Sequence, residues 1–218
     1  MATLSDLIPD ICPELPQCSI TLVQRQLLNT LRDFCWQTHY WQQAMTPITL
    51  LPFNESAPDT YIYTLPVPEG TELITTAELV FNGNPLNIQS ASWLDEHVHR
   101  WREKTGNPDY VLIMSNKQVR FVPASETVQP VAITGQLILQ PAREATSFSD
   151  DLLDFDYPIA NGALSRLLIM PNKPWSNTRR AATCEGIYQE GVSRAKFLVL
   201  KNFSTGAETI EQRTWLYD

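Results

Sequence analysis

The sequence is poor in the residues that carry most enzyme and metal chemistry. Of its 218 residues only 3 are His and 4 are Cys, and charged residues make up only 18%. Cys12, Cys18, Cys35 and Cys184 are scattered without CxxC spacing, which argues against a metal or redox motif. The first residues lack the basic and apolar regions of a secretory signal, so free buried thiols are favoured over disulfides. We therefore expect no cofactor and no bound metal.

Positive charge and long apolar runs are also scarce. The formal net charge is -8 and the sequence pI is about 4.9. A free-standing nucleic-acid binder normally carries a basic patch or a high pI, so specific DNA binding is not expected. An acidic surface that repels DNA remains compatible with the composition. No apolar run approaches the roughly 18 residues of a membrane-spanning helix, so no membrane partner is expected either.

Nucleophile and nucleotide-binding signatures are missing. The sequence contains no G-x-S-x-G, Walker loop, G-x-G-x-x-G or H-E-x-x-H. His97 and His99 form an HxH pair, but on the helix expected from residue 92 to Trp101 they point in different directions. Cys35 and His39 lie four residues apart on another expected helix, yet Cys35 belongs to its apolar stripe and favours core packing. These patterns predict a protein that is not an enzyme.

One acidic cluster is the remaining candidate for catalysis. Asp150, Asp151, Asp154 and Asp156 fail the EF-hand spacing. A glycosidase needs two carboxylates that flank a sugar, which spacing along a loop does not establish. Asp154 and Asp156 instead suit the positive N-terminus of a helix that begins at Pro158. A hydrolase that uses this cluster is the weakest of the three functions considered.

The hydrophobic pattern predicts an α+β fold. A long helix begins near residue 21, and the helical region ends before Pro47. Short runs rich in β-branched and aromatic residues then alternate with turn residues up to position 142, which is typical of an antiparallel sandwich or barrel. The expected division is residues 1–45 and 150–202 for an antiparallel helical bundle, 46–149 for an inserted β domain, and 203–218 for an extended arm. The expected strands are 48–53, 61–65, 72–81, 86–90, 110–115, 119–122 and 131–139, with turns at 82–83 and 116–117.

The most informative segment is a helical hairpin with small side chains. Pro158 suits the start of its first helix, and Pro171 stops that helix. The second helix is capped by Ser176 or Asn177 and runs to about residue 202. Each glycine inside a helix costs roughly 1 kcal/mol relative to alanine, which indicates close backbone approach within the hairpin or to a neighbouring copy. The candidate helix-helix assembly residues are Gly162, Gly186, Gly191 and Ala195.

The last segment is a candidate docking arm. Its 16 residues from Phe203 reach about 50 Å when extended. It ends in Trp215, Leu216 and Tyr217, and aromatic anchors of this type are enriched at interface hot spots. A disordered end is the alternative interpretation. We expect Phe203 and the three anchors to dock on a portal or on a neighbouring copy.

Taken together, these segments resemble the head-to-tail adaptor (connector) proteins of tailed bacteriophages. The resemblance covers most of the two ends of the chain. In the N-terminal module it lies in the runs LSDLIP (residues 4–9), PELPQC (13–18) and LRDFCWQT (31–38). In the C-terminal hairpin it lies in NGALSRL (161–167) and KPWSN (173–177).

The resemblance implies a structural virion protein made in the host cytoplasm and located in the viral neck, at the capsid vertex. Its copies would form a closed ring of about twelve subunits (a dodecamer) beneath the portal. The ring would join the capsid to downstream tail or nozzle proteins. DNA would pass through its channel during ejection without specific binding. An acidic chain suits such a channel, because Lys and Arg contacts to phosphate are what hold DNA.

A binding module is the main alternative. In that interpretation the β insert recognises a receptor, a glycan or a fibre protein, and the helices only attach it to the tail. The hydrolase interpretation of the acidic cluster comes third.

Overall fold

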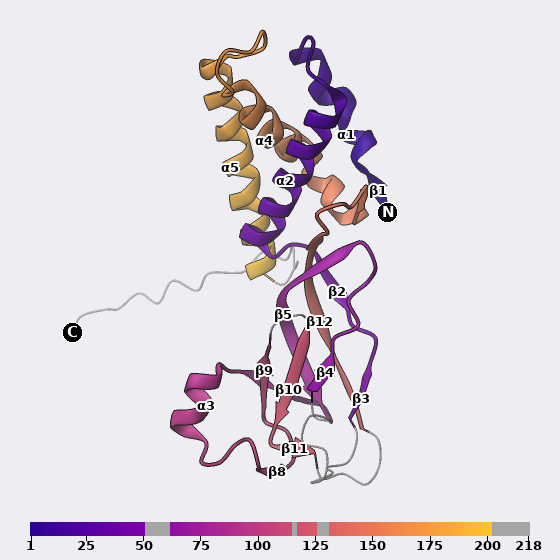
Figure 1. The fold of residues 1–218 in the computed structure, drawn as a ribbon, viewed down its shortest axis with the longest axis vertical. Coiled ribbons are helices and arrows are strands. Elements are labelled where there is room, and N and C mark those ends of the chain that lie inside the picture. The colour runs from indigo at the N-terminus through magenta and orange to yellow at the C-terminus, as the bar shows by residue number, and fades with distance from the viewer. Residues whose placement is uncertain (51–61, 115–116, 126–130, 202–218) are drawn as a thin grey trace, which may run out of the picture.

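A computed structural model describes residues 1–50, 62–114, 117–125 and 131–201. Four of the helices gather at one end of the long axis, and most of the strands lie at the other end together with helix α3 (Ala91–His97) (Figure 1). The chain runs through the helices, then through the strands, and returns to the helices. The described part is therefore mixed α+β, as the sequence predicts, with a β region inserted between two helical segments.

Five α-helices are present in the described residues. Four of them form the helical end: α1 (Leu4–Ile11), α2 (Ile20–Thr38), α4 (Asp156–Leu168) and α5 (Thr178–Leu200). The 3-10 helices η1 (Cys12–Glu14) and η3 (Asp150–Phe155) lead out of α1 and into α4. The α4 and α5 helices form the expected hairpin, and α2 packs beside them (Figure 1).

The two residues that flank helix α2 determine where it begins and ends. Ser19 has an extended backbone, and its hydroxyl accepts a hydrogen bond from the Leu22 N–H at 3.3 Å. At the other end His39 adopts a left-handed conformation with φ 54°, which stops the helix after Thr38. The helical region therefore ends at Thr38, well before Pro47, where the sequence predicts its end. The aromatic residues Tyr40 and Trp41 follow the helix rather than forming its last turns.

The chain also enters the sheet earlier than residue 46. Strand β2 (Gln42–Ala44) pairs antiparallel with β12 (Val131–Pro141), which places part of the expected helical segment 1–45 in the β region. The large sheet has the order β2-β12-β5-β6, and β3 (Ile48–Leu50) also pairs with β12. Its other members are β5 (Thr71–Phe81) and β6 (Asn84–Pro85). The two long strands β5 and β12 form its centre.

A second sheet has the order β4-β10-β9-β7. Its strands are β4 (Ile62–Thr64), β10 (Gln118–Val122), β9 (Tyr110–Ile113) and β7 (Asn87–Ile88). Two small sheets pair β11 (Ala124–Ser125) with β8 (Thr105–Gly106), and β1 (Ala2–Thr3) with β13 (Ser147–Phe148). The β7–β9 and β8–β11 pairs are parallel, which the sequence does not predict. None of the described sheets closes into a barrel.

One expected hairpin turn is confirmed. Asn82 and Gly83 both have positive φ, at 50° and 80°, and they connect β5 to β6. At the second expected turn Lys117 has φ 65°, between the antiparallel strands β9 and β10. Its neighbour Asn116 lies outside the described residues.

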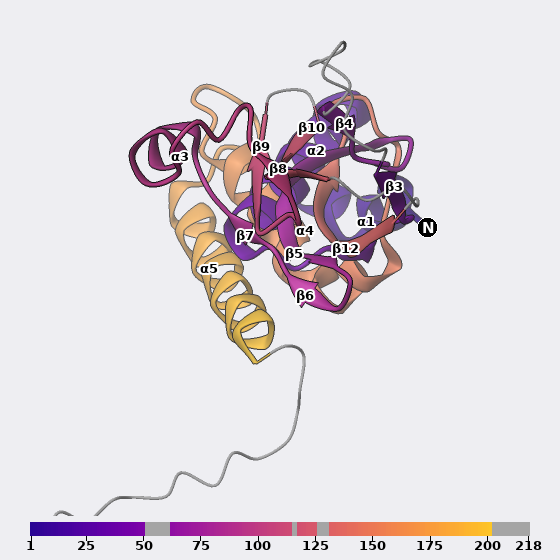
Figure 2. The ribbon, with the colours of Figure 1, turned by 90° about the horizontal axis from the view of Figure 1, so that it is seen from below.

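Helix α3 (Ala91–His97) forms a side lobe on the second sheet (Figure 2). Ser90 caps its N-terminus, and the helix ends at His97 rather than at Trp101. Trp101 is buried beyond the helix, with the Arg102 and Arg120 guanidinium groups 4.2 and 5.3 Å from its ring centre. The lobe has its own small core, so it is an appendage of the β region.

The main core is continuous between the helical end and the β region. Buried residues of α1, α2, α4 and α5 belong to the same cluster as buried residues of both larger sheets. Arg32 of α2 strengthens this junction: its guanidinium donates to the Pro141 carbonyl and to the Glu72 carboxylate, the latter at 2.8 Å. The two regions therefore share one core. In the described residues, no helix is both long enough and apolar enough to cross a membrane.

Candidate assembly surface

Two of the candidate glycines bring helices into close contact. A Cβ added to Gly162 of α4 would lie 2.6 Å from the Tyr188 ring and 2.7 Å from the Thr30 methyl group. A Cβ added to Gly191 of α5 would overlap the ring of Pro158 on α4. Real side-chain carbons do not approach this closely, so glycine is required at both positions for the observed packing. The expected close backbone approach lies within the hairpin at these sites.

The other two candidate residues differ from each other. Ala195 is fully buried on the inner face of α5. Gly186 is exposed, and a Cβ added there would meet nothing within 4 Å. Close packing inside the chain therefore does not explain Gly186. The contact of Gly186 with a neighbouring copy stays a prediction.

The candidate docking residues Phe203, Trp215, Leu216 and Tyr217 lie outside the described residues. Helix α5 ends at Leu200, two residues before the expected end. Val199, in its last turn, lines a hollow described below. The end of α5 therefore lies beside this hollow.

A partly buried polar network joins α2, α4 and α5. One carboxylate oxygen of Asp33, on α2, accepts from the Arg166 guanidinium at 2.6 Å and from the Tyr188 hydroxyl at 3.0 Å. The Gln37 amide also donates to it, at 2.9 Å. Burial, with Asp33 as neighbour, raises the pKa of Tyr188 and keeps its hydroxyl protonated as a donor. One carboxylate oxygen of Asp33 therefore links α2, α4 and α5.

A second pair fastens α5 to the N-terminal segment. The Arg180 guanidinium donates to both oxygens of the Glu14 carboxylate, at 2.9 and 2.6 Å. This two-point geometry is the strong form of an Arg–carboxylate pair. The hydrogen bonds from Arg180 hold the pKa of Glu14 below its ordinary value. Segments 166 positions apart in sequence are joined in this way.

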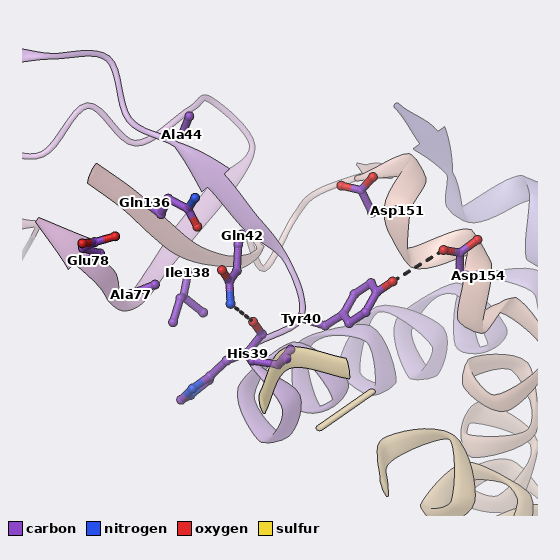
Figure 3. Close-up of a pocket in the computed structure, with 11 residues that line it drawn as sticks. His39, Tyr40, Gln42, Ala44, Ala77, Glu78, Gln136, Ile138, Asp151 and Asp154 are labelled. Carbon is purple, nitrogen blue, oxygen red and sulfur yellow. Dashed lines mark hydrogen bonds between the residues drawn. The ribbon is translucent and has the colours of Figure 1, made fainter. Parts of the chain in front are cut away.

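A hollow of about 910 Å³ opens where the helices meet the large sheet (Figure 3). Tyr40 points across it, and its hydroxyl donates to Asp154 at 3.5 Å. The carboxylates of Glu78, Asp151 and Asp154 line it, and among its lining residues only His39 can carry a positive charge. The hollow is therefore acidic.

A smaller hollow of about 380 Å³ is lined by residues of η3, the start of α4 and the middle of α5, and Asp154 lines this one too. Its lining includes Pro158, Ile187 and Tyr157, whose side chain is 62% exposed. The Arg194 guanidinium lies 5.8 Å from the centre of the Phe155 ring. The carboxylates of Asp154, Asp156 and Glu190 line it as well, so this hollow combines apolar walls with three acids and one cation.

The acidic cluster does not converge on one point. Asp150 pairs with the N-terminal amine at 2.7 Å, and Asp151 accepts from the Ser149 hydroxyl at 2.8 Å. Asp156 begins α4 and accepts from the Tyr157 N–H, as expected for an acid at a helix N-terminus. Asp154 turns instead to Tyr40. Each carboxylate has a separate partner, which gives no support to a pair arranged for hydrolysis.

The cysteines and histidines show no arrangement for catalysis in the described part of the chain. All four cysteines are free thiols, and Cys35 and Cys184 are buried. Burial raises the pKa of Cys35 to about 12, so its thiol stays protonated. His97 stacks on Trp93 with ring centres 4.4 Å apart. No group of three or more potential metal ligands occurs among the described residues.

Sequence reasoning missed several residues that organise this surface. Asp33 and Arg166 are 133 positions apart, and no local pattern indicates that they pair. Gly135 of β12 also lacks room for a side chain, since a Cβ there would lie 2.7 Å from the Leu79 side chain. Its position inside a run of β-branched residues was the available signal, because a glycine within a strand marks close backbone approach.

Comparison with protein-family models and with curated proteins gave no match.

Proposed function

We propose that this protein is a non-enzymatic structural protein of a tailed-phage neck, whose copies form a ring beneath the portal. The ring joins the capsid to the tail and continues the DNA channel. The proposal includes an antiparallel helical bundle as the assembly unit. It also includes a sandwich formed by the two larger sheets, which contacts downstream tail or nozzle proteins. The arm 203–218 docks on the portal or on a neighbouring copy.

The pairing of Asp33 with Arg166 carries this proposal. The resemblance to adaptor proteins rests on short runs at the two ends of the chain, and these two residues belong to two of those runs. Their ion pair at 2.6 Å brings the runs into one unit. Glu14 and Arg180 add a second link between the N-terminal run and the start of α5. The separate runs thus supply the parts of one helical unit, as an adaptor requires.

Substitutions in the arm of the full chain test the proposal. Replacing Trp215, Leu216 and Tyr217 together by Ala should leave a folded protein that no longer adds to the portal ring of the same genome. The reason is that aromatic anchors supply most of the energy of such contacts. Pull-down on the immobilised portal measures the loss. The matched control replaces Thr205, Glu208 and Glu211 of the same arm by Ala and should keep binding. Normal portal loading by the anchor variant would contradict the docking-arm role.

The α3 lobe favours one alternative, a β region that recognises a receptor, glycan or fibre protein. Trp93, His97 and Tyr110 form an aromatic cluster there, with Trp93 5.4 Å from Tyr110 between ring centres. Aromatic clusters on a projecting lobe are common recognition elements. A glycan array probed with the full chain separates the two functions: specific glycan binding abolished by Trp93→Ala would favour the binding module.

A further inference from the structure

One side of helix α5 is exposed along its length in the described structure. The other side packs on α4 and α2, and α5 forms an outer edge of the helical end (Figures 1 and 2). At 3.6 residues per turn the exposed residues fall on the side that faces away from α4. We call this side the outer face of α5, and it includes Arg179, Gly186, Ser193, Lys196, Phe197 and Leu200.

Two large apolar side chains are exposed on the outer face. Phe197 is 55% exposed and Leu200 is 82% exposed, and they lie about one helical turn apart. A side chain added at Gly186, further along the same face, would meet nothing within 4 Å, so there is room for a neighbouring backbone. Adjacent exposed apolar side chains mark a surface for protein contact.

The outer face is basic in an otherwise acidic chain. Residues 166–201 carry seven Lys or Arg and two Glu, whereas residues 1–165 carry eight Lys or Arg and 19 Asp or Glu. Arg166 and Arg180 are each paired with a carboxylate inside the chain. In the described part of the chain Arg179 and Lys196 form no ion pair, so their charges are open to a partner.

The remainder of the same chain has the complementary charge. Residues 1–165 form an acidic body, and the larger hollow on it is lined by the carboxylates of Glu78, Asp151 and Asp154. Two α5 faces packed on each other would bring like charges together. A basic face against the acidic body of the next copy is attractive instead, and such head-to-tail contact is the kind that closes a ring.

The arm is a weaker occupant for the same face. Residues 202–218 carry three acids and one Arg, a far smaller excess of negative charge than that of residues 1–165. Charge complementarity therefore favours the body of a neighbouring copy over an arm.

We propose that the outer face of α5 binds the acidic body, residues 1–165, of a second copy of this chain. The inference rests on the ring of the proposed function and assigns one side of the contact between its neighbours. Arg179 and Lys196 pair with carboxylates of the neighbour. Phe197 and Leu200 form the apolar centre of the contact, and Gly186 lets the neighbour approach closely.

Zero-length cross-linking of the full chain tests which residues meet. A carbodiimide joins a Lys amine directly to a carboxylate, and isotopically heavy and light protein are mixed, both free at high concentration and with the portal ring. The expected products are heavy–light pairs that join Lys196 or Lys201 to an Asp or Glu of residues 1–165. Lys104, an exposed residue beyond α3, is the internal control and should form no heavy–light pair.

Three results would overturn the inference. The first is the absence of heavy–light pairs at Lys196 and Lys201 in both samples. The second is cross-linking of these two lysines only to the acids of the arm or only to the portal. The third is equal cross-linking of Lys104, which would show that the pairs are not specific to α5.

A double substitution tests the charges. Arg179→Glu combined with Lys196→Glu should lower the yield of heavy–light pairs at Lys201 by roughly tenfold or more, because like charges then face each other. Arg100→Glu combined with Lys104→Glu is the matched control: it makes the same change in charge at exposed sites outside the hairpin and should leave the yield unchanged. Thermal melts check that each variant is folded. An undiminished yield in the first variant, or an equal loss in the control, would overturn the charge pairing.

A single substitution tests the apolar centre. Leu200→Ser should lower the yield of heavy–light pairs by roughly tenfold, since a few apolar anchors carry most of the energy of a contact. Ile169→Ser is the control, because Ile169 is also an exposed apolar residue, at 63%, but lies at the end of α4. Equal yields from Leu200→Ser and the wild type would overturn the role of Leu200.

The inference and the proposed function can fail separately. Protein that adds to the portal, while Lys196 and Lys201 never cross-link to another copy, would keep the ring and overturn the α5 contact. Protein that shows these heavy–light pairs but never adds to the portal would keep the α5 contact and overturn the neck function.

Discussion

Gly191 of α5 lies against the ring of Pro158 on α4, with no space for a side chain between them. A Cβ placed on Gly191 would be 2.7 Å from the Pro158 Cγ. The contact lies at the N-terminal end of α4, and both residues line the smaller hollow. The separation of the two helices therefore depends on the absence of a side chain at position 191.

Gly191→Leu should destabilise the protein by about 1–3 kcal/mol, because the added side chain must displace Pro158 or separate the helices. Chemical denaturation followed by circular dichroism measures the change in the free energy of unfolding. Gly186→Leu is the matched control on the same helix. It has open space around it and should raise stability by roughly 0.5–1 kcal/mol, since Leu is the better helix former.

The same pair of variants separates packing inside the chain from packing between copies. If a neighbour approaches α5 at Gly186, Gly186→Leu should impair ring formation while the single chain stays stable. Equal stability of wild type and Gly191→Leu would contradict the tight contact with Pro158.

Asp33→Ala should cost about 1–3 kcal/mol, because the buried Tyr188 hydroxyl loses its acceptor and the partly exposed Arg166 guanidinium loses its ion-pair partner. Tyr188→Phe removes one donor and leaves Asp33 paired with Arg166, so it should cost only about 0.5–1.5 kcal/mol. Thermal and urea unfolding of the two variants measures the difference. A larger loss from Tyr188→Phe than from Asp33→Ala would show that Asp33 is not the centre of the network.

The Arg32–Glu72 pair gives stability that depends on pH. The hydrogen bond from Arg32 holds the pKa of Glu72 below its ordinary value in the folded state. The unfolded chain therefore binds more protons as the solution is acidified. The contribution is present above the ordinary carboxyl pKa and is lost as the pH falls through the lowered value.

Arg32→Met should remove this part of the pH dependence. The Glu72 side chain is 37% exposed, so the effect after solvent screening is about 0.5–1 kcal/mol. Urea unfolding between about pH 7 and pH 3 measures it. Arg25→Met, at an exposed site on the same helix, is the control and should leave the slope intact. A wild-type slope in Arg32→Met would show that the pair contributes nothing to folding.

The larger elements could be predicted from the sequence because their signals are local. The hairpin was indicated by its prolines and by the periodic apolar residues around Gly162, and the structure confirms the cap at Asn177. The long strands β5 and β12 were indicated by their β-branched runs. The end of α2 was missed because it depends on the left-handed backbone of His39, a conformation that only a few per cent of residues other than glycine adopt.

Pairings between distant segments could not be predicted. The parallel contacts of β7 with β9 and of β8 with β11 involve strands of two to four residues, too short for a periodic pattern. The hollow lined by Tyr40 and Asp154 is also assembled from η3, α5 and the large sheet, so no single segment indicates it.

Native mass spectrometry of the full chain, alone and mixed with the portal ring from the same genome, tests the central claim most directly. The account predicts a discrete addition of copies to the portal, whose mass gives the number of subunits in the ring. A soluble monomer that never adds to the portal, at any mixing ratio, would contradict the neck function and favour the β region as a recognition module.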